Sequence, residues 1–540
     1  MKKVFFIVAF LSLACTQKTQ IAVNQIGFYP EQEKIAVLEG AFTGTFQLVE
    51  ETSGKTVFEG TAGEISPAAF SGTLCTGLDF SAFENPGTYR ILTSNGIRSH
   101  VFAIDRQVLI PLALAALNAF TLQRSTPGHP DTAVLVHASA ATESRPEGAL
   151  ISSPGGWYDA GDYNKYIVNA SYTTGMILAG VEKYGGYVNN ASVKDEALYN
   201  LKWALTMQDP VDGGVYHKLT TPEFEGFIPP EACEKPRYVI QKSVTATLDF
   251  AASMAQGARV YRQTDWGRPI AVEMVQAAEA AFAWALENPD CFYNQWLLNK
   301  NYIPAIQTGA YSDNHAEDEF FWAAAELYLT TGKEKYYQTL LEYAPELFTA
   351  PVWSNVAGLG IFSLLTHGKA TEAMKEQLIA FCDSVSSLSQ GAAYVASFGN
   401  NKEDFHWGSL SEKCCANAIS LLYGYELTQE KKYLVHAFHN MDYLLGRNPT
   451  GYCFVTGMGT KSPRNPHHRL AATDDLPGPL PGFLVGGPNW GKQDGCNYPS
   501  PWPDRSYLDI VESYASNEIA INWNATLLHL AVALDSFSSW

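Results

Sequence analysis

The sequence predicts a multidomain α and β chain, in which a small β-sandwich precedes a larger helical domain. Two patterns indicate this. From about residue 21 to residue 105, hydrophobic and polar residues alternate in short runs, as in half-buried strands. From about residue 106, hydrophobic residues recur every three or four positions, as on one face of a helix. We therefore divide the mature chain into a sandwich over 20–105 and a helical domain over 106–540.

The predicted strands lie in three runs, KIAVLEG, GTFQLVEETSGKTVFEG and GTYRILTSNGIRSHVFAI. The second run contains Ser53-Gly54 and the third contains Asn95-Gly96, and both pairs are typical of tight hairpin turns. Short strands joined by hairpins at this spacing favour a β-sandwich.

The helical domain contains about ten to twelve predicted helices, among them VEMVQAAEAAFAWAL and INWNATLLHLAVAL. We recognise no strand-like run between them. Because no fixed repeat period recurs, a closed ring of helix pairs is favoured over a solenoid. The long loop over 450–507 is of a length that is usually functional.

Composition narrows the class of partner. The 540 residues carry a net charge of −19 and show no Lys/Arg cluster, so a nucleic acid would be repelled. Aromatic residues make up 13% of the chain, with 12 Trp and 28 Tyr. Many belong in a core, but flat aromatic rings also stack on sugar faces.

The first 19 residues resemble an export signal. Two lysines precede an apolar stretch from Val4 to Ala14, which is too short to span a bilayer. Cys15 follows directly, as at a bacterial lipoprotein processing site. We expect an exported protein, attached to a membrane of the cell envelope (periplasm or outer membrane) through a lipidated Cys15, or else secreted. The other cysteines are scattered without a CxxC pair and indicate no metal site.

The run GGWYDAGDYNKYIVN places two carboxylates, Asp159 and Asp162, on either side of an Ala-Gly pair. A turn at Gly161 would direct both into one space. The alternative is that Asp162 caps a helix beginning near Asn164, a position that aspartate favours.

A third carboxylate, Glu518, lies in YLDIVESYASNEIAINWNA and is followed by an apolar stretch. Apolar surroundings raise the pKa of a carboxyl group and keep it protonated near neutral pH. The alternative is a surface glutamate at the start of the last helix.

Two further segments carry polar and aromatic groups. In NPHHR, His467 and Arg469 can donate hydrogen bonds to hydroxyl groups, or simply brace the loop. In HWGSLSEKCCAN, His406 and Trp407 precede a helix and can line a cleft, although a tryptophan is more often found in the core.

Carboxylates in unlike surroundings on separate loops are what acetal hydrolysis requires. One group protonates the leaving oxygen, and another activates water or attacks carbon. Together with export and abundant aromatics, they predict a secreted carbohydrase.

These same motifs resemble glycoside hydrolase family 9, a cellulase family, over nearly all of the mature chain. The resemblance rests on WYDAGDYNKYIVN, on NMDYLLGRNPTGYCFVTGMG before the PHHR loop, and on YLDIVESYASNEIAINWNA. It implies an (α/α)6 barrel behind an N-terminal immunoglobulin-like domain, to which VNQIGFYPEQEKIAVL is similar.

The resemblance also implies roles for individual residues. Asp162 would be the general base, Asp159 its partner on the nucleophilic water, and Glu518 the general acid. Further substrate-binding candidates are His467, Arg469, the supporting carboxylate Asp509, and the aromatic residues Trp407 and Tyr158.

The implied activity is an inverting endo-β-1,4-glucanase acting on cellulose, mixed-linkage glucan or xyloglucan. An exo-acting β-glucosidase or exo-β-glucosaminidase of the same family, and a non-catalytic glycan-binding protein, are the alternatives. We expect a monomer that needs no cofactor. Calcium occurs in several relatives, so a structural calcium is possible, but no ligand set can be matched here.

Overall fold

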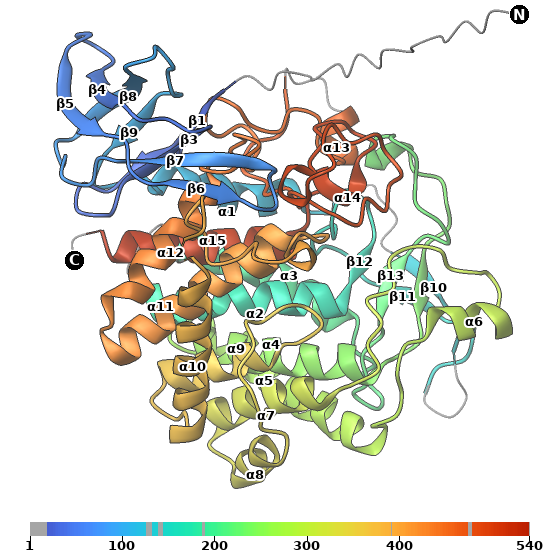
Figure 1. Ribbon diagram of the computed structural model, residues 1–540. Helices are drawn as coiled ribbons and strands as arrows, with labels where there is room; N and C mark the ends of the chain where they lie inside the picture. Colours follow the sequence, from blue (N-terminus) through green and yellow to red (C-terminus); the bar gives the residue numbers. More distant parts are fainter. Residues whose placement is uncertain are drawn as a thin grey trace, which may run out of the picture.

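The computed structural model describes residues 19–125, 132–138, 144–185, 190–389, 391–473 and 478–538. A β-sandwich lies against one side of a larger helical barrel (Figure 1). Cys15 and most of the predicted signal fall outside the described residues. Within them, no helix is both long and apolar enough to cross a membrane.

The sandwich consists of two sheets, with strand orders β1-β3-β7-β6 and β2-β9-β8-β4-β5. Its strands are β1 (Ile21–Ala22), β2 (Gly27–Phe28), β3 (Ile35–Glu39), β4 (Thr45–Glu50), β5 (Thr56–Thr61), β6 (Ile65–Ala68), β7 (Thr73–Asp79), β8 (Gly87–Thr93) and β9 (Phe102–Ile104). Burial alternates along β8, as the sequence pattern predicts. Between the sheets, Phe28 meets Phe80 and Phe102 edge to face at 5.3 and 5.4 Å.

The barrel has an inner and an outer layer of helices. The inner ones are α2 (Ile167–Tyr184), α4 (Val244–Tyr261), α7 (Glu317–Thr331), α9 (Ala357–Thr366), α11 (Ala416–Thr428) and α15 (Ile521–Ser536). Each of these helices contacts the next one, and the last, α15, contacts the first, α2. Between α9 and α11, the ring of Phe362 stacks on that of Tyr423 with 4.0 Å between the ring centroids. The ring is therefore closed, which confirms the prediction of helix pairs in a ring.

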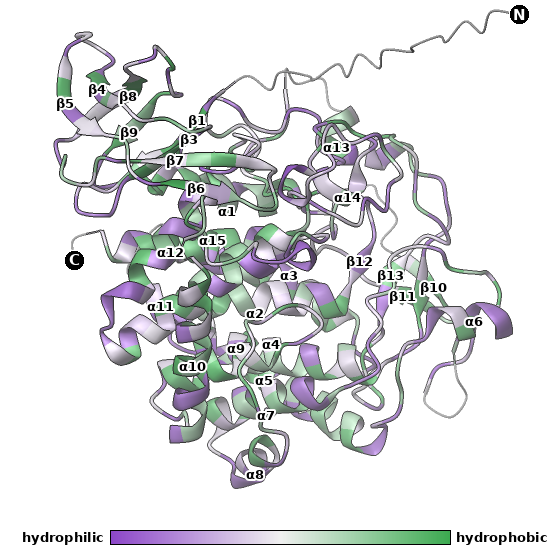
Figure 2. Cartoon of the chain, in the orientation of Figure 1, coloured by the Kyte–Doolittle hydropathy of each residue, from purple (hydrophilic) through white to green (hydrophobic). Residues whose placement is uncertain are grey.

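The outer layer consists of α1 (Ile110–Leu122), α3 (Asn190–Thr206), α5 (Arg268–Glu287), α8 (Glu334–Glu342), α10 (Glu372–Leu388) and α12 (Lys431–Leu444). The two layers differ in how much of each helix is buried. Every residue of α4 is buried, whereas α5 buries only one face. Hydrophilic residues mark outer segments such as α6 (Gln295–Asn301) in Figure 2.

One expectation about this domain was wrong. Five short strands, β10 (Thr132–Val136), β11 (Leu150–Ser152), β12 (Lys165–Tyr166), β13 (Lys218–Thr220) and β14 (Tyr238–Ile240), form a sheet in the loops of the barrel. With two to five residues each, they are too short to show an alternating pattern. This sheet matters for function because β12 leads directly into α2 from the DAGD segment.

Buried polar contacts join the sandwich to the barrel. Tyr29 donates to Asp535 Oδ1 at 2.8 Å, and Asn24 donates to Asp442 Oδ1 at the same distance. Glu39 accepts a hydrogen bond from Arg505 at 2.9 Å, and both side chains are buried. Such directional contacts fix one orientation of the two parts.

Candidate active site

A cleft of about 880 Å³ opens on the loop side of the barrel. Three carboxylates, Asp159, Asp162 and Glu518, line it together. The remaining walls are largely aromatic and include Tyr166, Tyr311, Trp353, Trp407, Tyr514 and Trp523. A cavity of this size, with a few convergent polar groups among aromatic ones, is typical of a small-molecule or oligosaccharide site.

Backbone pairing brings the distant carboxylate segments together. Ala160 pairs with Ala520, His467 with Glu518, and the Ile521 amide donates to the Asp159 carbonyl at 2.9 Å. Glu518 therefore lies on a short extended segment held between the DAGD turn and the PHHR loop. Residues more than 300 positions apart thereby share one rigid frame.

Asp159 is buried and has a hydrogen bond to each oxygen. Asn169 donates to Oδ1 at 2.7 Å, and Tyr311 donates to Oδ2 at 2.8 Å. Burial and the nearby charge of Asp162 raise the pKa of Asp159, and the two donors oppose that rise. The donors fix the plane of the carboxylate.

Asp162 is not a helix cap, because α2 begins only after Tyr166 and no side chain caps it. The Asp162 Oδ2 atom accepts from Asn164 through its side chain at 2.5 Å and its backbone amide at 3.3 Å. The other oxygen, Oδ1, accepts no hydrogen bond from any residue that the structure describes. Burial raises the pKa of Asp162, while the positive charge of Arg469 lowers it.

Gly161 is required for a reason other than the sharp turn that we expected. Its φ is not in the left-handed region, but a Cβ atom there would lie 2.1 Å from the His467 carbonyl oxygen. The Gly161 carbonyl accepts from the Arg469 backbone at 3.0 Å and from its guanidinium at 2.8 Å. Glycine lets the DAGD turn and the PHHR loop touch.

Glu518 keeps part of its surface open to the cleft. Burial raises its pKa well above the ordinary glutamate range, and the charges of Asp162 and Asp159 add to the rise. The alternative of a surface glutamate is therefore wrong. Such a carboxyl group retains its proton to a higher pH than an ordinary glutamate does and can give it to a neighbouring oxygen.

His467 and Arg469 lie beside these carboxylates in the cleft wall. His467 Nδ1 is 2.6 Å from the Val511 carbonyl, which can only accept, so Nδ1 carries the proton. Burial and the charge of Arg469 lower the pKa of His467, which leaves Nε2 as a neutral acceptor. Arg469 is anchored through Nε to the Glu225 carbonyl at 2.9 Å.

The other predicted residues have different places. Trp407 lines the cleft and is 39% exposed, so it is not a core residue. Tyr158 is fully buried outside the cleft lining, so the structure contradicts its placement against substrate. Asp509 also lies outside the lining, where it accepts from the amides of Arg464 and Asn465 at 2.8 to 3.0 Å and supports the PHHR loop.

Tyr311, Trp353 and Glu412 are among the cleft residues that were not singled out from the sequence. Tyr311 contacts Asp159, Trp353 packs edge to face on Tyr311 at 4.9 Å, and Glu412 adds a fourth carboxyl group. Tyr311 and Trp353 stand in no motif, and Glu412 lies in the segment HWGSLSEKCCAN, of which only His406 and Trp407 were singled out. Their positions depend on loops that only the fold brings together.

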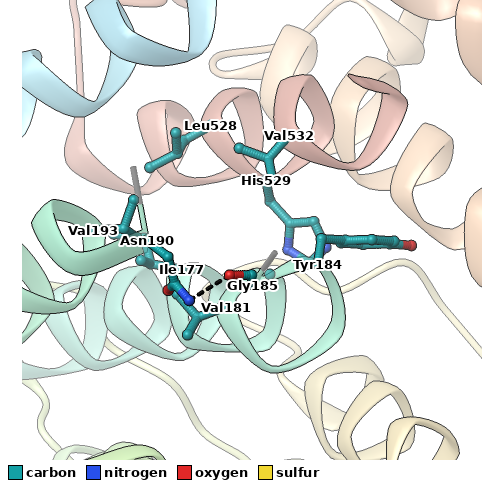
Figure 3. A pocket seen from close by; sticks show the side chains of 10 residues that line it. Ile177, Val181, Tyr184, Gly185, Asn190, Val193, Leu528, His529 and Val532 are labelled. Carbon is teal, nitrogen blue, oxygen red and sulfur yellow. Dashed lines mark hydrogen bonds between the residues drawn. The ribbon is translucent and has the colours of Figure 1, made fainter. Parts of the chain in front are cut away.

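A much smaller cavity, at the opposite end of α2, is shown in Figure 3. Leu528, His529 and Val532 of α15 face Ile177 and Tyr184 of α2 across it. Its volume of about 20 Å³ holds about one water molecule and no sugar. Among the described residues, no three His, Cys, Asp or Glu side chains are grouped to hold a metal ion, and the structural calcium stays a prediction.

Comparison with known proteins supports a carbohydrate-active site. The model of glycosyl hydrolase family 9 matches residues 112–531, and that of the cellulase N-terminal ig-like domain matches residues 16–97. A xyloglucan-specific endo-beta-1,4-glucanase of Bacteroides ovatus is 48% identical over 99% of this chain and 98% of its own length. Endoglucanase D of Acetivibrio thermocellus is 30% identical over 96% of this chain and 84% of its own length.

A solved structure titled Bacteroides ovatus GH9 superposes with a TM-score of 0.90 at 47% identity, over 96% of this chain and 99% of that one. This confirms the immunoglobulin-like sandwich followed by an (α/α)6 barrel. The chain belongs to glycosyl hydrolase family 9 and is a glycoside hydrolase.

Proposed function

We propose that the enzyme is an inverting endo-β-1,4-glucanase whose preferred substrate is xyloglucan. The observation that carries the reaction type is the meeting of Glu518 with Asp159 and Asp162 in one cleft. The substrate is suggested by the Bacteroides ovatus relative, which matches this chain along almost its whole length.

In the proposed reaction, water attacks the anomeric carbon on the face opposite the leaving sugar. Asp162 accepts the water proton, and Asp159 holds the same water in line. Glu518 gives its proton to the glycosidic oxygen as that bond breaks. A single displacement inverts the anomeric configuration. Solvent then takes the proton from Asp162 and returns one to Glu518.

The surrounding residues orient the sugar chain in the cleft. The Nε2 lone pair of His467 accepts from a sugar hydroxyl, and the guanidinium of Arg469 donates to sugar oxygens. Trp407 and Tyr514, whose rings are 5.3 Å apart, provide flat surface for pyranose rings. These roles require only the chain's own residues and water.

Product analysis tests this proposal. We expect rapid viscosity loss on tamarind-type xyloglucan before many reducing ends appear, and weaker activity on cellulose and mixed-linkage glucan. Proton NMR during hydrolysis should show the α-anomer of the new reducing end first. Release of a monosaccharide from the outset would instead assign the exo-acting alternative, and an initial β-anomer would exclude inversion.

We also propose that the protein is exported and anchored through Cys15. Two lysines, the apolar stretch and Cys15 support this. The mature protein should partition into detergent and carry acyl chains by mass spectrometry, whereas Cys15→Ser should lose both properties. An unmodified, water-soluble mature protein would overturn the anchor.

A further inference from the structure

The cleft contains a second acid and imidazole pair that the proposed mechanism does not use. Glu412 and His406 both line it, with Glu412 Oε2 3.6 Å from His406 Nε2. Their side chains are 22% and 33% exposed. No residue that the structure describes hydrogen-bonds to the Glu412 carboxyl group, so it is available to a ligand.

The backbone around Glu412 is fixed on both sides. Glu412 lies in a π-helical segment, Leu410–Cys415. Segments of this kind are rare in proteins, and those that occur are often found at functional sites. Ser411 bonds to Thr526 of α15 at 2.9 Å, and Cys414 bonds to the Asn440 carbonyl at 3.1 Å. The carboxyl group is therefore presented from a rigid frame rather than from a mobile loop.

The tautomer of His406 follows from its contacts. Its Nδ1 is 3.1 Å from the Trp407 carbonyl, which can only accept a hydrogen bond. Burial lowers the pKa of His406, so Nε2 is an unprotonated acceptor that faces Glu412. Burial also raises the pKa of Glu412, to about 7.

The 3.6 Å separation suits a shared ligand atom. It exceeds the usual length of an N···O hydrogen bond, yet one oxygen can lie about 2.8 Å from both atoms. That oxygen can donate to His406 Nε2 and accept from the protonated carboxyl group of Glu412, which is the pattern of a hydroxyl group. Indole rings of Trp407 and Trp353 line the same cleft and offer stacking surface.

The pair is separate from the reacting groups. Hydrogen bonds to Asp159 and Asp162 come from Asn164, Asn169 and neighbouring tyrosines, and none involves Glu412 or His406. Since none of these bonds links the pair to the aspartates, the pair can hold a sugar other than the one that is cleaved at its anomeric carbon.

We propose that Glu412 and His406 form a sugar-binding subsite, in which both side chains hydrogen-bond to one hydroxyl group of a glucan unit adjacent to the cleaved one. This inference rests on the proposed glucanase function. It predicts that the pair contributes to the binding of oligosaccharide and not to proton transfer.

The test measures binding of a xyloglucan oligosaccharide by calorimetry in the Asp162→Asn background, with kcat, KM and thermal unfolding measured in the active enzyme. Glu412→Ala and His406→Ala should each weaken binding about tenfold, the value of one good hydrogen bond. Because they share one hydroxyl, the double variant should lose little more than either single variant. The pH limits of kcat should not move.

Glu403→Gln is the matched control, since Glu403 is exposed on a neighbouring turn outside the cleft lining, and it should bind as the parent does. Unchanged binding in Glu412→Ala, or losses that simply add in the double variant, would overturn the shared subsite. A collapse of kcat with binding intact would overturn it in favour of proton transfer. If the wild-type enzyme cleaves no β-glucan, the proposed function fails instead.

Discussion

Tyr311 donates a 2.8 Å hydrogen bond to Asp159 from a backbone with φ of +45°, a conformation uncommon for a residue with a side chain. The first residue of strand β13 and the residue before it hold this segment in place. His217 bonds to the Ala310 carbonyl and Lys218 to the Gly309 carbonyl, both at 2.7 Å. Backbone strain maintained by such a frame is typical of functional sites.

Removing this hydrogen bond should slow catalysis without unfolding the enzyme. We expect Tyr311→Phe to lower kcat about tenfold, since Asp159 loses the donor that orients one oxygen. Steady-state kinetics and a thermal unfolding midpoint measure the two effects. Tyr337→Phe, on α8 outside the cleft, is the control and should match the wild type. An unchanged kcat in Tyr311→Phe would show that the bond does not hold Asp159 for reaction.

The two carboxylates to which we assign proton transfer should each be essential. Asp162→Asn and Glu518→Gln keep the shape of the side chain but cannot accept or release a proton, so kcat should fall at least about a hundredfold. Circular dichroism should remain native and oligosaccharide binding should persist. A variant that retains wild-type turnover would lose its assigned role.

The pH profile of kcat/KM should be bell-shaped, and both of its limbs should lie at higher pH than ordinary carboxyl groups would place them. In the proposed reaction Asp162 acts as an anion, so activity should fall when the pH drops through its raised pKa. Glu518 acts in its protonated form, so activity should fall when the pH rises through a pKa well above the ordinary glutamate range. An alkaline limb near the ordinary value of about 4.3 would contradict the burial effect on Glu518.

Gly161→Ala should disrupt the site although it adds only a methyl group. That methyl would lie 2.1 Å from the His467 carbonyl, a backbone atom that cannot move without shifting the Glu518 segment paired with it. We expect activity to fall at least tenfold and the unfolding midpoint to drop by several degrees. Gly77→Ala, with open space at its Cβ position, should leave both unchanged. Full activity in Gly161→Ala would mean that the two loops can separate freely.

The sandwich should stabilise the barrel through Glu39. Glu39→Ala leaves the Arg505 guanidinium buried without its carboxylate, which costs about 3–5 kcal/mol for a buried ion pair. A lower unfolding midpoint should be accompanied by reduced kcat, because Arg505 begins the segment that leads to Glu518. Glu59→Ala, at an exposed position of β5, is the control. If neither property changes, the interface contributes nothing through this pair.

Much of the fold, and the motifs that carry the three carboxylates of the cleft, could be predicted from sequence because those features are local. Alternation in β8 and helical periodicity in α5 are properties of consecutive residues, and burial follows them directly. The DAGD and NEIAIN motifs likewise stand out through their own composition. The short sheet around β13 could not be predicted, because strands of a few residues leave no period.

The sequence by itself determined the order of the two domains and the family, and it singled out the carboxylates Asp159, Asp162 and Glu518 as candidates. Tertiary structure decided which side chains share the cleft. It placed Trp407 in the cleft and Tyr158 in the core, and it added Tyr311 and Glu412. The physical reason is that burial and pairing of loop residues depend on contacts between segments hundreds of positions apart, which leave no pattern along the chain.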